Sequence, residues 1–266
     1  MKQPKILRQH RRWSRIMKNA YYEEYWDKKP EEWTPSSGTI SVDEKAIFIR
    51  YLHSGTRCLD YGCGDGIRYG KMLTEKGVQY LGFDISENAV KQAAGIGLDV
   101  KLLTLEGKTS LDESAVDVAI CFEVLEHLQE PQNALAEIYR CLKPGGHALI
   151  SVPNAAFWTQ RIEFLLTGFW CPGGSPHTAR KSPWRDPHIR FYHPKLLRRF
   201  VLCEGFEIAE SIGESFTLGA LPYVWRRPKL RAMADFISRP IGWLGRVLPS
   251  WFGARLFIVA RKPFKN

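Results

Sequence analysis

Short apolar stretches alternate with segments of helical periodicity along most of the chain. Runs of apolar residues indicate buried strands, and apolar residues that recur every three or four positions indicate helices. Alternation of the two at this spacing predicts an α/β fold with a doubly wound, mostly parallel sheet. The first predicted strand begins at Cys58, and the others are 78–84, 98–103, 116–122, 147–152, a sixth that starts at 205–209, and 254–260; the predicted helices are 67–76, 87–95 and 132–142.

Some segment ends carry further signals. Residues 43–53 have helical spacing, and Asp43 is expected to be the N-cap of that helix. Ser86 is expected to cap the predicted helix 87–95. The segment 104–114 lacks an apolar stripe and is expected to be a loop. Residues 41–266 are therefore expected to form one domain.

The first predicted strand runs into a turn with a glycine at every second position, Asp60-Tyr61-Gly62-Cys63-Gly64-Asp65-Gly66. Glycine permits positive φ and lets a ligand lie against bare backbone, and a helix starting near Gly66 would point its amide groups at that ligand. A dinucleotide fingerprint needs a small residue where Ile67 stands, and no Walker-type Gly-Lys-Ser/Thr ending is present. The turn predicts a ligand site without a phosphate-binding motif.

Two carboxylates accompany this turn. Asp84 ends the second predicted strand, where an acid can accept hydrogen bonds from ribose hydroxyls. Asp60 precedes the glycines and could hold an ammonium group. An amine, a ribose and an otherwise apolar slot together describe S-adenosylmethionine (SAM).

The chain resembles the class I (Rossmann-like) SAM-dependent methyltransferases, nearest in pattern to the ubiquinone-type O-methyltransferases. The four stretches that carry the resemblance, in order, are the glycine turn, Tyr80 to Ser86, Asp117 to Leu128, and Leu142 to Asn154. The resemblance implies a seven-stranded sheet with an antiparallel last strand. It also implies cofactor contacts from Asp60, Gly62, Gly64, Asp84, Ile85 and Phe122. In the family an acid in the segment after the third strand often faces the adenine amino group, and Glu106 is the nearest candidate here.

The end of the fourth predicted strand carries candidate catalytic residues. Glu123, Glu126 and His127 would share one face if a helical turn followed the strand. Glu126 and His127 are the predicted catalytic residues, with His127 as a base or a scaffold residue. In two subgroups that the chain resembles, this pattern and a later histidine hold a metal. His188 is the candidate for that histidine and His193 the second, but a divalent metal is not the favoured interpretation.

Charge is unevenly distributed. The net charge of +10 comprises +7 in residues 1–18, +9 in residues 221–266 and −6 between them. The basic ends point to an anionic surface. Residues 1–40 form a basic and aromatic N-terminal extension, either a flap over the substrate pocket or a separate binding arm.

Scattered cysteines favour buried thiols in a reducing compartment, and no apolar run approaches a membrane span. A cytoplasmic location is expected, and peripheral contact with the inner face of the membrane is compatible with it. Residues 155–193 are expected to wall the substrate side. Residues 214–252 are an amphipathic insertion with tryptophans and arginines, either a lid or a helix on a membrane surface.

These features predict methyl transfer to an oxygen of a small-molecule, lipid-linked or glycan acceptor. The alternatives are an RNA 2′-O-methyltransferase that uses a Glu/Glu/His-bound metal and a SAM-binding module without turnover. Nucleic acid is the less favoured partner because residues 19–220 are acidic and no Asn-Pro-Pro-Tyr-type motif follows the fifth predicted strand.

Overall fold

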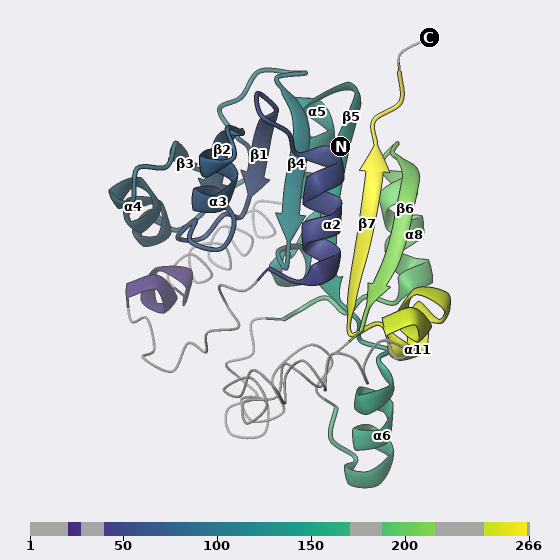
Figure 1. Ribbon diagram of the computed structural model, residues 1–266. Helices are drawn as coiled ribbons and strands as arrows, with labels where there is room; N and C mark the ends of the chain where they lie inside the picture. Colours follow the sequence, from purple (N-terminus) through teal and green to yellow (C-terminus); the bar gives the residue numbers. More distant parts are fainter. Residues whose placement is uncertain (1–20, 28–39, 171–187, 216–241, 265–266) are drawn as a thin grey trace, which may run out of the picture. The chain divides into compact units, whose positions relative to one another are not determined.

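A computed structural model describes residues 21–27, 40–170, 188–215 and 242–264, and it contains the predicted sheet (Figure 1). Seven strands follow the order β3-β2-β1-β4-β5-β7-β6. Strand β7 runs antiparallel to both of its neighbours. The predicted α/β class and the antiparallel last strand are confirmed. The chain divides into two compact units, Met1–Val118 and Ala119–Asn266.

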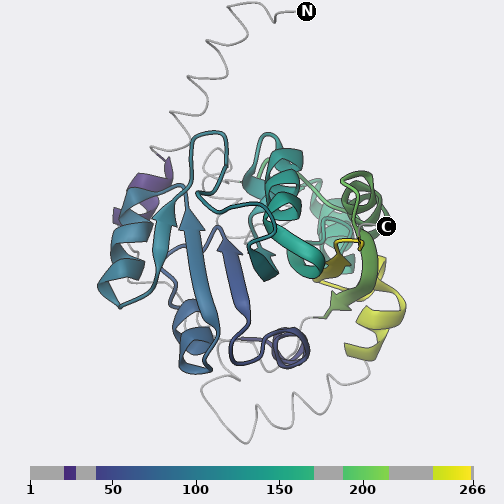
Figure 2. The same cartoon turned by 90° about the horizontal axis from the view of Figure 1, so that it is seen from above.

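The first unit contains parallel strands that lead to the glycine turn. Strand β1 (Arg57–Tyr61) pairs with β2 (Gln79–Asp84), which pairs with β3 (Val100–Leu102). Figure 2 shows these three strands side by side, in shades of blue. Helices α3 (Gly70–Glu75) and α4 (Glu87–Gly95) pack on β2, and α4 also packs on β3.

Two helix starts in this unit differ from the sequence prediction. Helix α2 (Val42–Tyr51) is capped by Ser41, not Asp43, because Ser41 and Glu44 form a reciprocal capping box. Helix α3 begins at Gly70, later than the start expected near Gly66. The left-handed φ of Gly66, +69°, keeps the chain in a turn beyond the glycines.

The second unit contains helices and the three strands of the antiparallel end of the sheet. Its elements are the 3₁₀ turn η2 (Leu125–His127), α5 (Pro131–Cys141), β5 (Leu142–Pro153), α6 (Trp158–Thr167), α8 (Pro194–Cys203), β6 (Glu207–Glu214), α11 (Pro249–Phe252) and β7 (Arg255–Arg261). Strand β4 (Val116–Phe122) matches its predicted range and crosses the boundary between the units. Its residues are nearly all buried, as the apolar run indicates.

Strand β5 begins directly after α5, well before the predicted start at His147. The cause is a partner at its beginning: the amide of Gly145 donates to the carbonyl of Lys262, and the amide of Lys262 donates to the carbonyl of Gly146. This pairing extends the ladder between β5 and β7. Pro144, Gly145 and Gly146 are therefore strand residues.

The predicted segments outside the core are described only in part. Residues 1–20, 28–39, 171–187 and 216–241 lie outside the described residues, so most of the amphipathic insertion does too. Within the described ranges, no helix combines the length and the apolar character needed to cross a membrane. Cys58, Cys121 and Cys141 are buried, as expected, whereas Cys203 is exposed.

Candidate active site

The glycine turn requires glycine both for its backbone conformation and for the space around it. Gly62, Gly64 and Gly66 all have positive φ, at +83°, +56° and +69°. The amide of Gly62 donates to the carbonyl of Phe83 at 2.7 Å, which ties the turn to the end of β2. A Cβ on Gly66 would collide with the side chain of Leu98. Glycine is required here for both conformation and space.

Asp84 is held against this turn at the end of β2. Its Oδ2 accepts from the amide of Gly64 at 2.9 Å and its Oδ1 from the amide of Ser86 at 2.9 Å. Burial raises the pKa of Asp84, while the two amide donors lower it. Each oxygen has a further lone pair, so the carboxylate can still accept hydrogen bonds from a ligand's hydroxyl groups. Ile85 follows it, half-buried.

Asp60 lies buried at the end of β1. Its Oδ2 accepts a hydrogen bond of 2.7 Å from the hydroxyl of Tyr80, a strand residue of β2. Burial raises the pKa of Asp60 to about 7, and the Tyr80 hydroxyl opposes that shift. The sequence analysis did not assign Tyr80 a role. The pairing of β1 with β2 brings Tyr80 to Asp60, and no local sequence pattern around Tyr80 predicts this contact.

Phe122 and Glu106 were also expected at the cofactor site. Phe122 is buried at the end of β4, and its ring contacts Phe257 of β7 edge to face at 5.4 Å between centroids. Glu106 lies exposed in the loop between β3 and β4. That loop is irregular, as the missing apolar stripe predicted.

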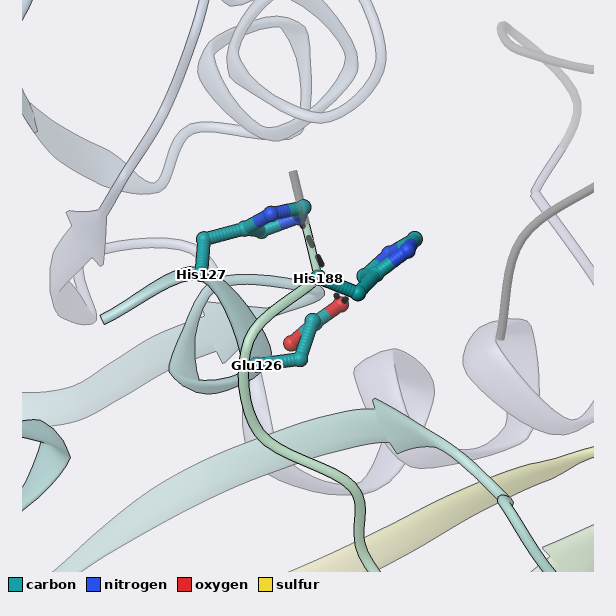
Figure 3. Close-up of side chains that lie close together, drawn as sticks. All are labelled: Glu126, His127 and His188. Carbon is teal, nitrogen blue, oxygen red and sulfur yellow. Dashed lines mark ion pairs between the residues drawn. The ribbon is translucent and has the colours of Figure 1, made fainter. Parts of the chain in front are cut away.

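A second group of side chains lies around η2 in the second unit (Figure 3). One carboxylate oxygen of Glu126 and one ring nitrogen each of His127 and His188 lie within 4.8 Å of one another. Glu126 Oε1 is 3.7 Å from His127 Nε2 and 4.0 Å from His188 Nε2. The two imidazoles stack with centroids 4.7 Å apart. This geometry confirms neither role proposed for His127, but it gathers the residues that the sequence analysis selected.

Backbone hydrogen bonds bring His188 to this group. The amides of Ile189 and Arg190 both donate to the carbonyl of Glu126, at 2.9 and 3.0 Å. The Arg190 guanidinium donates to the carbonyl of Gln129 at 2.6 Å, and the Tyr192 hydroxyl to that of Leu125 at 3.3 Å. The chain after His188 is thereby fixed along η2.

Glu126 is the least satisfied group of this cluster. Its side chain is 1% exposed, and neither carboxylate oxygen has a hydrogen-bond partner among the described residues. Burial raises the pKa of Glu126 well above its usual range, and the charge of Glu123 raises it further. A buried carboxylate is costly unless a cation or hydrogen-bond donors compensate it.

Glu123 is not in this group, so the expectation of a shared helical face is wrong. Glu123 takes a left-handed φ of +55°, and η2 starts only at Leu125. The Glu123 carboxylate accepts a hydrogen bond of 2.8 Å from the Ser151 hydroxyl of β5. His193, the second candidate for a later histidine, instead caps α8 by accepting from the amide of Lys195 at 3.2 Å.

Comparisons with known proteins agree on one family. A model of the methyltransferase domain matches residues 25–211. A ubiquinone biosynthesis O-methyltransferase from Thiobacillus denitrificans is 34% identical over 198 residues, covering 69% of this chain and 81% of the relative. The protein of that name from Burkholderia thailandensis is 27% identical over 169 residues, covering 61% of this chain and 69% of the relative.

Solved structures show the same fold. A SAM-dependent methyltransferase from Archaeoglobus fulgidus superposes with a TM-score of 0.54 at 20% identity, covering 83% of this chain and 92% of the other. One from Aquifex aeolicus gives a TM-score of 0.52 at 18% identity, covering 86% and 93%.

Proposed function

The chain belongs to the SAM-dependent methyltransferase family, and from that premise we propose that it methylates an oxygen atom of a small-molecule acceptor. The family makes the protein an enzyme with SAM as its cofactor. The choice of oxygen is supported by the relatives, which are named O-methyltransferases. The single structural observation that supports proton removal from a hydroxyl is the buried Glu126 carboxylate, whose oxygens have no hydrogen-bond partner among the described residues.

The cofactor is proposed to bind through the residues that the motifs select. Asp84 accepts hydrogen bonds from the ribose hydroxyls, and Asp60 holds the ammonium group of the methionine moiety. Gly62 and Gly64 offer bare backbone to the ligand, and Ile85 and Phe122 add apolar contacts. Methyl transfer from a sulfonium is an in-line displacement, so the main tasks of the protein are alignment and exclusion of water.

Glu126, His127 and His188 are proposed to hold a divalent cation that assists the acceptor hydroxyl. One carboxylate and two imidazoles fit a divalent transition-metal ion such as Mn²⁺. A cation would also give the Glu126 oxygens the partner that they lack among the described residues. A bound cation would lower the pKa of an acceptor hydroxyl that coordinates it. In the competing account, His127 accepts the acceptor proton without a metal.

Binding of Mn²⁺, measured by electron paramagnetic resonance on the purified protein, tests the cation directly. We expect Glu126→Gln and His188→Ala to weaken Mn²⁺ binding at least tenfold. Loss of even a group that only orients a metal ligand commonly lowers metal affinity that much. Glu113→Gln, which removes an exposed carboxylate elsewhere, is the matched control. Wild-type protein that binds no Mn²⁺ and methylates at full rate in excess chelator would leave His127 as the base.

The acceptor itself is best sought by transfer of labelled methyl from SAM into fractionated extracts of small molecules, lipids, glycans and RNA. Label in an alkali-stable ether of a small molecule is the expected result. Label that appears only at nitrogen, or only in RNA, would contradict the proposal.

A lipid-linked acceptor at an anionic membrane surface is the second candidate. The observation that favours it is a set of exposed apolar side chains near the end of the insertion, Trp243, Val247 and Trp251 at 63%, 53% and 49% exposure. Against it, Arg161 lies over the Trp251 ring at 4.0 Å and donates to the carbonyl of Ser250, so α11 also packs on the substrate-side segment. Tryptophans and basic residues suit a membrane interface.

Sedimentation with anionic and neutral vesicles separates the two interpretations of the insertion. Membrane contact predicts binding to anionic vesicles that falls steeply with salt. Trp243→Ala should weaken that binding. Equal and negligible binding to both vesicle types at low salt would refute membrane contact and leave the lid as the remaining interpretation of the insertion.

A further inference from the structure

The described part of the N-terminal extension, helix 21–27, lies against α4 and the glycine turn. In Figures 1 and 2 this purple helix lies beside α4. The contacts all fall within the first compact unit of the chain. They place the segment at the cofactor end of the sheet, whereas the sequence analysis considered only a substrate flap or a separate arm.

Glu23 forms the main attachment of this helix. Its carboxylate accepts from the amide of Glu87 at 2.6 Å, from the amide of Asn88 at 3.1 Å and from the hydroxyl of Ser86 at 3.1 Å. Ser86 is the N-cap of α4 and itself accepts from the amide of Ala89. The first amides of α4 are thus satisfied by two groups, one of them a carboxylate far away in sequence. A carboxylate at a helix N-terminus is stabilised by the helix dipole and by charge-assisted hydrogen bonds.

Side chains of α4 complete the attachment from the other direction. Asn88 Nδ2 donates to the carbonyl of Glu23 at 3.1 Å, and Gln92 Nε2 donates to the carbonyl of Trp26 at 2.7 Å. Asn88 and Gln92 are four residues apart and therefore share one face of α4. Helix 21–27 is therefore attached to α4 both by the Glu23 side chain and by the backbone carbonyls of Glu23 and Trp26.

This attachment positions Trp26 on the glycine turn. A Cβ at Gly64 would lie 2.7 Å from Cζ2 of the Trp26 indole, so the ring rests directly against the backbone of Gly64. Gly64 is also the residue whose amide donates to Asp84. The indole therefore lies on the side of Gly64 where a side chain would project, next to the backbone that, under the proposed function, receives the cofactor.

We propose that helix 21–27 is a strap that closes the SAM site, with Trp26 as a cofactor-site wall and Glu23 as its positioning residue. The inference rests on the proposed cofactor roles of Gly64 and Asp84. A closed strap retains SAM during the reaction, and S-adenosylhomocysteine leaves when the Glu23 attachment to α4 opens. The hydrogen bonds of Glu23 then set the rate of cofactor exchange.

The test is release of labelled S-adenosylhomocysteine from the full-length protein into excess unlabelled ligand, alongside calorimetric titration with SAM. Trp26→Ala should speed release of S-adenosylhomocysteine and weaken SAM binding about tenfold, in line with the loss of a large aromatic contact. Trp26→Phe should recover part of the loss. Glu23→Gln should speed release several-fold and raise amide exchange in residues 87 and 88, while Ser86 still caps α4.

Asp27→Asn is the matched control, because it removes a carboxylate from the same helix that takes no part in these contacts. It should leave release unchanged. Unchanged release in Trp26→Ala and Glu23→Gln, with SAM still bound by the wild type, would overturn the strap and leave the proposed function intact. Tighter SAM binding by Trp26→Ala would also overturn it, since the indole would then occupy ligand space. A wild type that binds no SAM would refute the cofactor site and the strap with it.

Discussion

Tyr80→Phe isolates the group that keeps Asp60 ready to bind an ammonium group. The Tyr80 hydroxyl donates to Asp60 Oδ2 at 2.7 Å, and both residues are buried, at 5% and 3% exposure. Burial raises the pKa of Asp60 to about 7, so this carboxyl changes its charge around neutral pH. SAM affinity should therefore rise as pH increases through 7.

The size of the effect follows from the strength of that hydrogen bond. A hydrogen bond to a charged group contributes about 1.5–3 kcal/mol, which corresponds to about 1–2 pH units in the Asp60 pKa. Removing the hydroxyl raises that pKa further and lowers the ionised fraction at pH 7. We expect SAM affinity to fall about 5- to 50-fold at pH 7 and to return to within about twofold of the wild type at pH 9.

Calorimetric titration with SAM between pH 6 and pH 9 is the assay. Titration in two buffers of different ionisation enthalpy adds a second readout, because SAM binding at pH 6 should expel a proton from Asp60. Tyr69→Phe is a matched control, since its hydroxyl donates instead to Glu44 Oε1 at 2.6 Å. A pH midpoint that is the same in Tyr80→Phe and the wild type, or no proton release at pH 6, would refute the assigned role of Asp60.

The same physical reasoning extends to two other positions. Asp84→Ala removes a buried acceptor at the proposed ribose site and should weaken SAM by about 1–3 kcal/mol in calorimetry; unchanged affinity would remove the ribose role alone. Lys262→Met keeps the buried stem but loses the ammonium that donates to the carbonyls of Tyr139 at 2.8 Å and Leu142 at 2.7 Å. Leaving both carbonyls without that donor should lower the free energy of unfolding by about 2–4 kcal/mol in urea denaturation, and an unchanged midpoint would contradict this.

The fold was predictable because its signals are local. Strand β4 needs a continuous apolar run, since it is covered on both faces, and its range was predicted to the residue. Ser86 at the start of α4 was recognisable from its type and position alone. The positive φ of the glycines and the position of Asp84 follow likewise from residue type and strand spacing.

Boundaries were less predictable where a partner distant in sequence decided them. Strand β5 starts at Leu142 because the chain around Lys262 pairs with Gly145 and Gly146. Local sequence there, with a proline and two glycines, resembles a turn. The ladder hydrogen bonds outweigh that preference.

The candidate catalytic group shows what only the tertiary structure decided. Sequence spacing placed Glu123, Glu126 and His127 on one helical face, but the left-handed backbone of Glu123 turns its carboxylate to Ser151. His188 joins Glu126 because the amides that follow it bond to the Glu126 carbonyl. Likewise, Glu23 reaches α4 across a sequence distance that no periodicity spans. Residue types and spacing determined which groups were available, whereas long-range backbone hydrogen bonds, which no local pattern encodes, determined which of them meet.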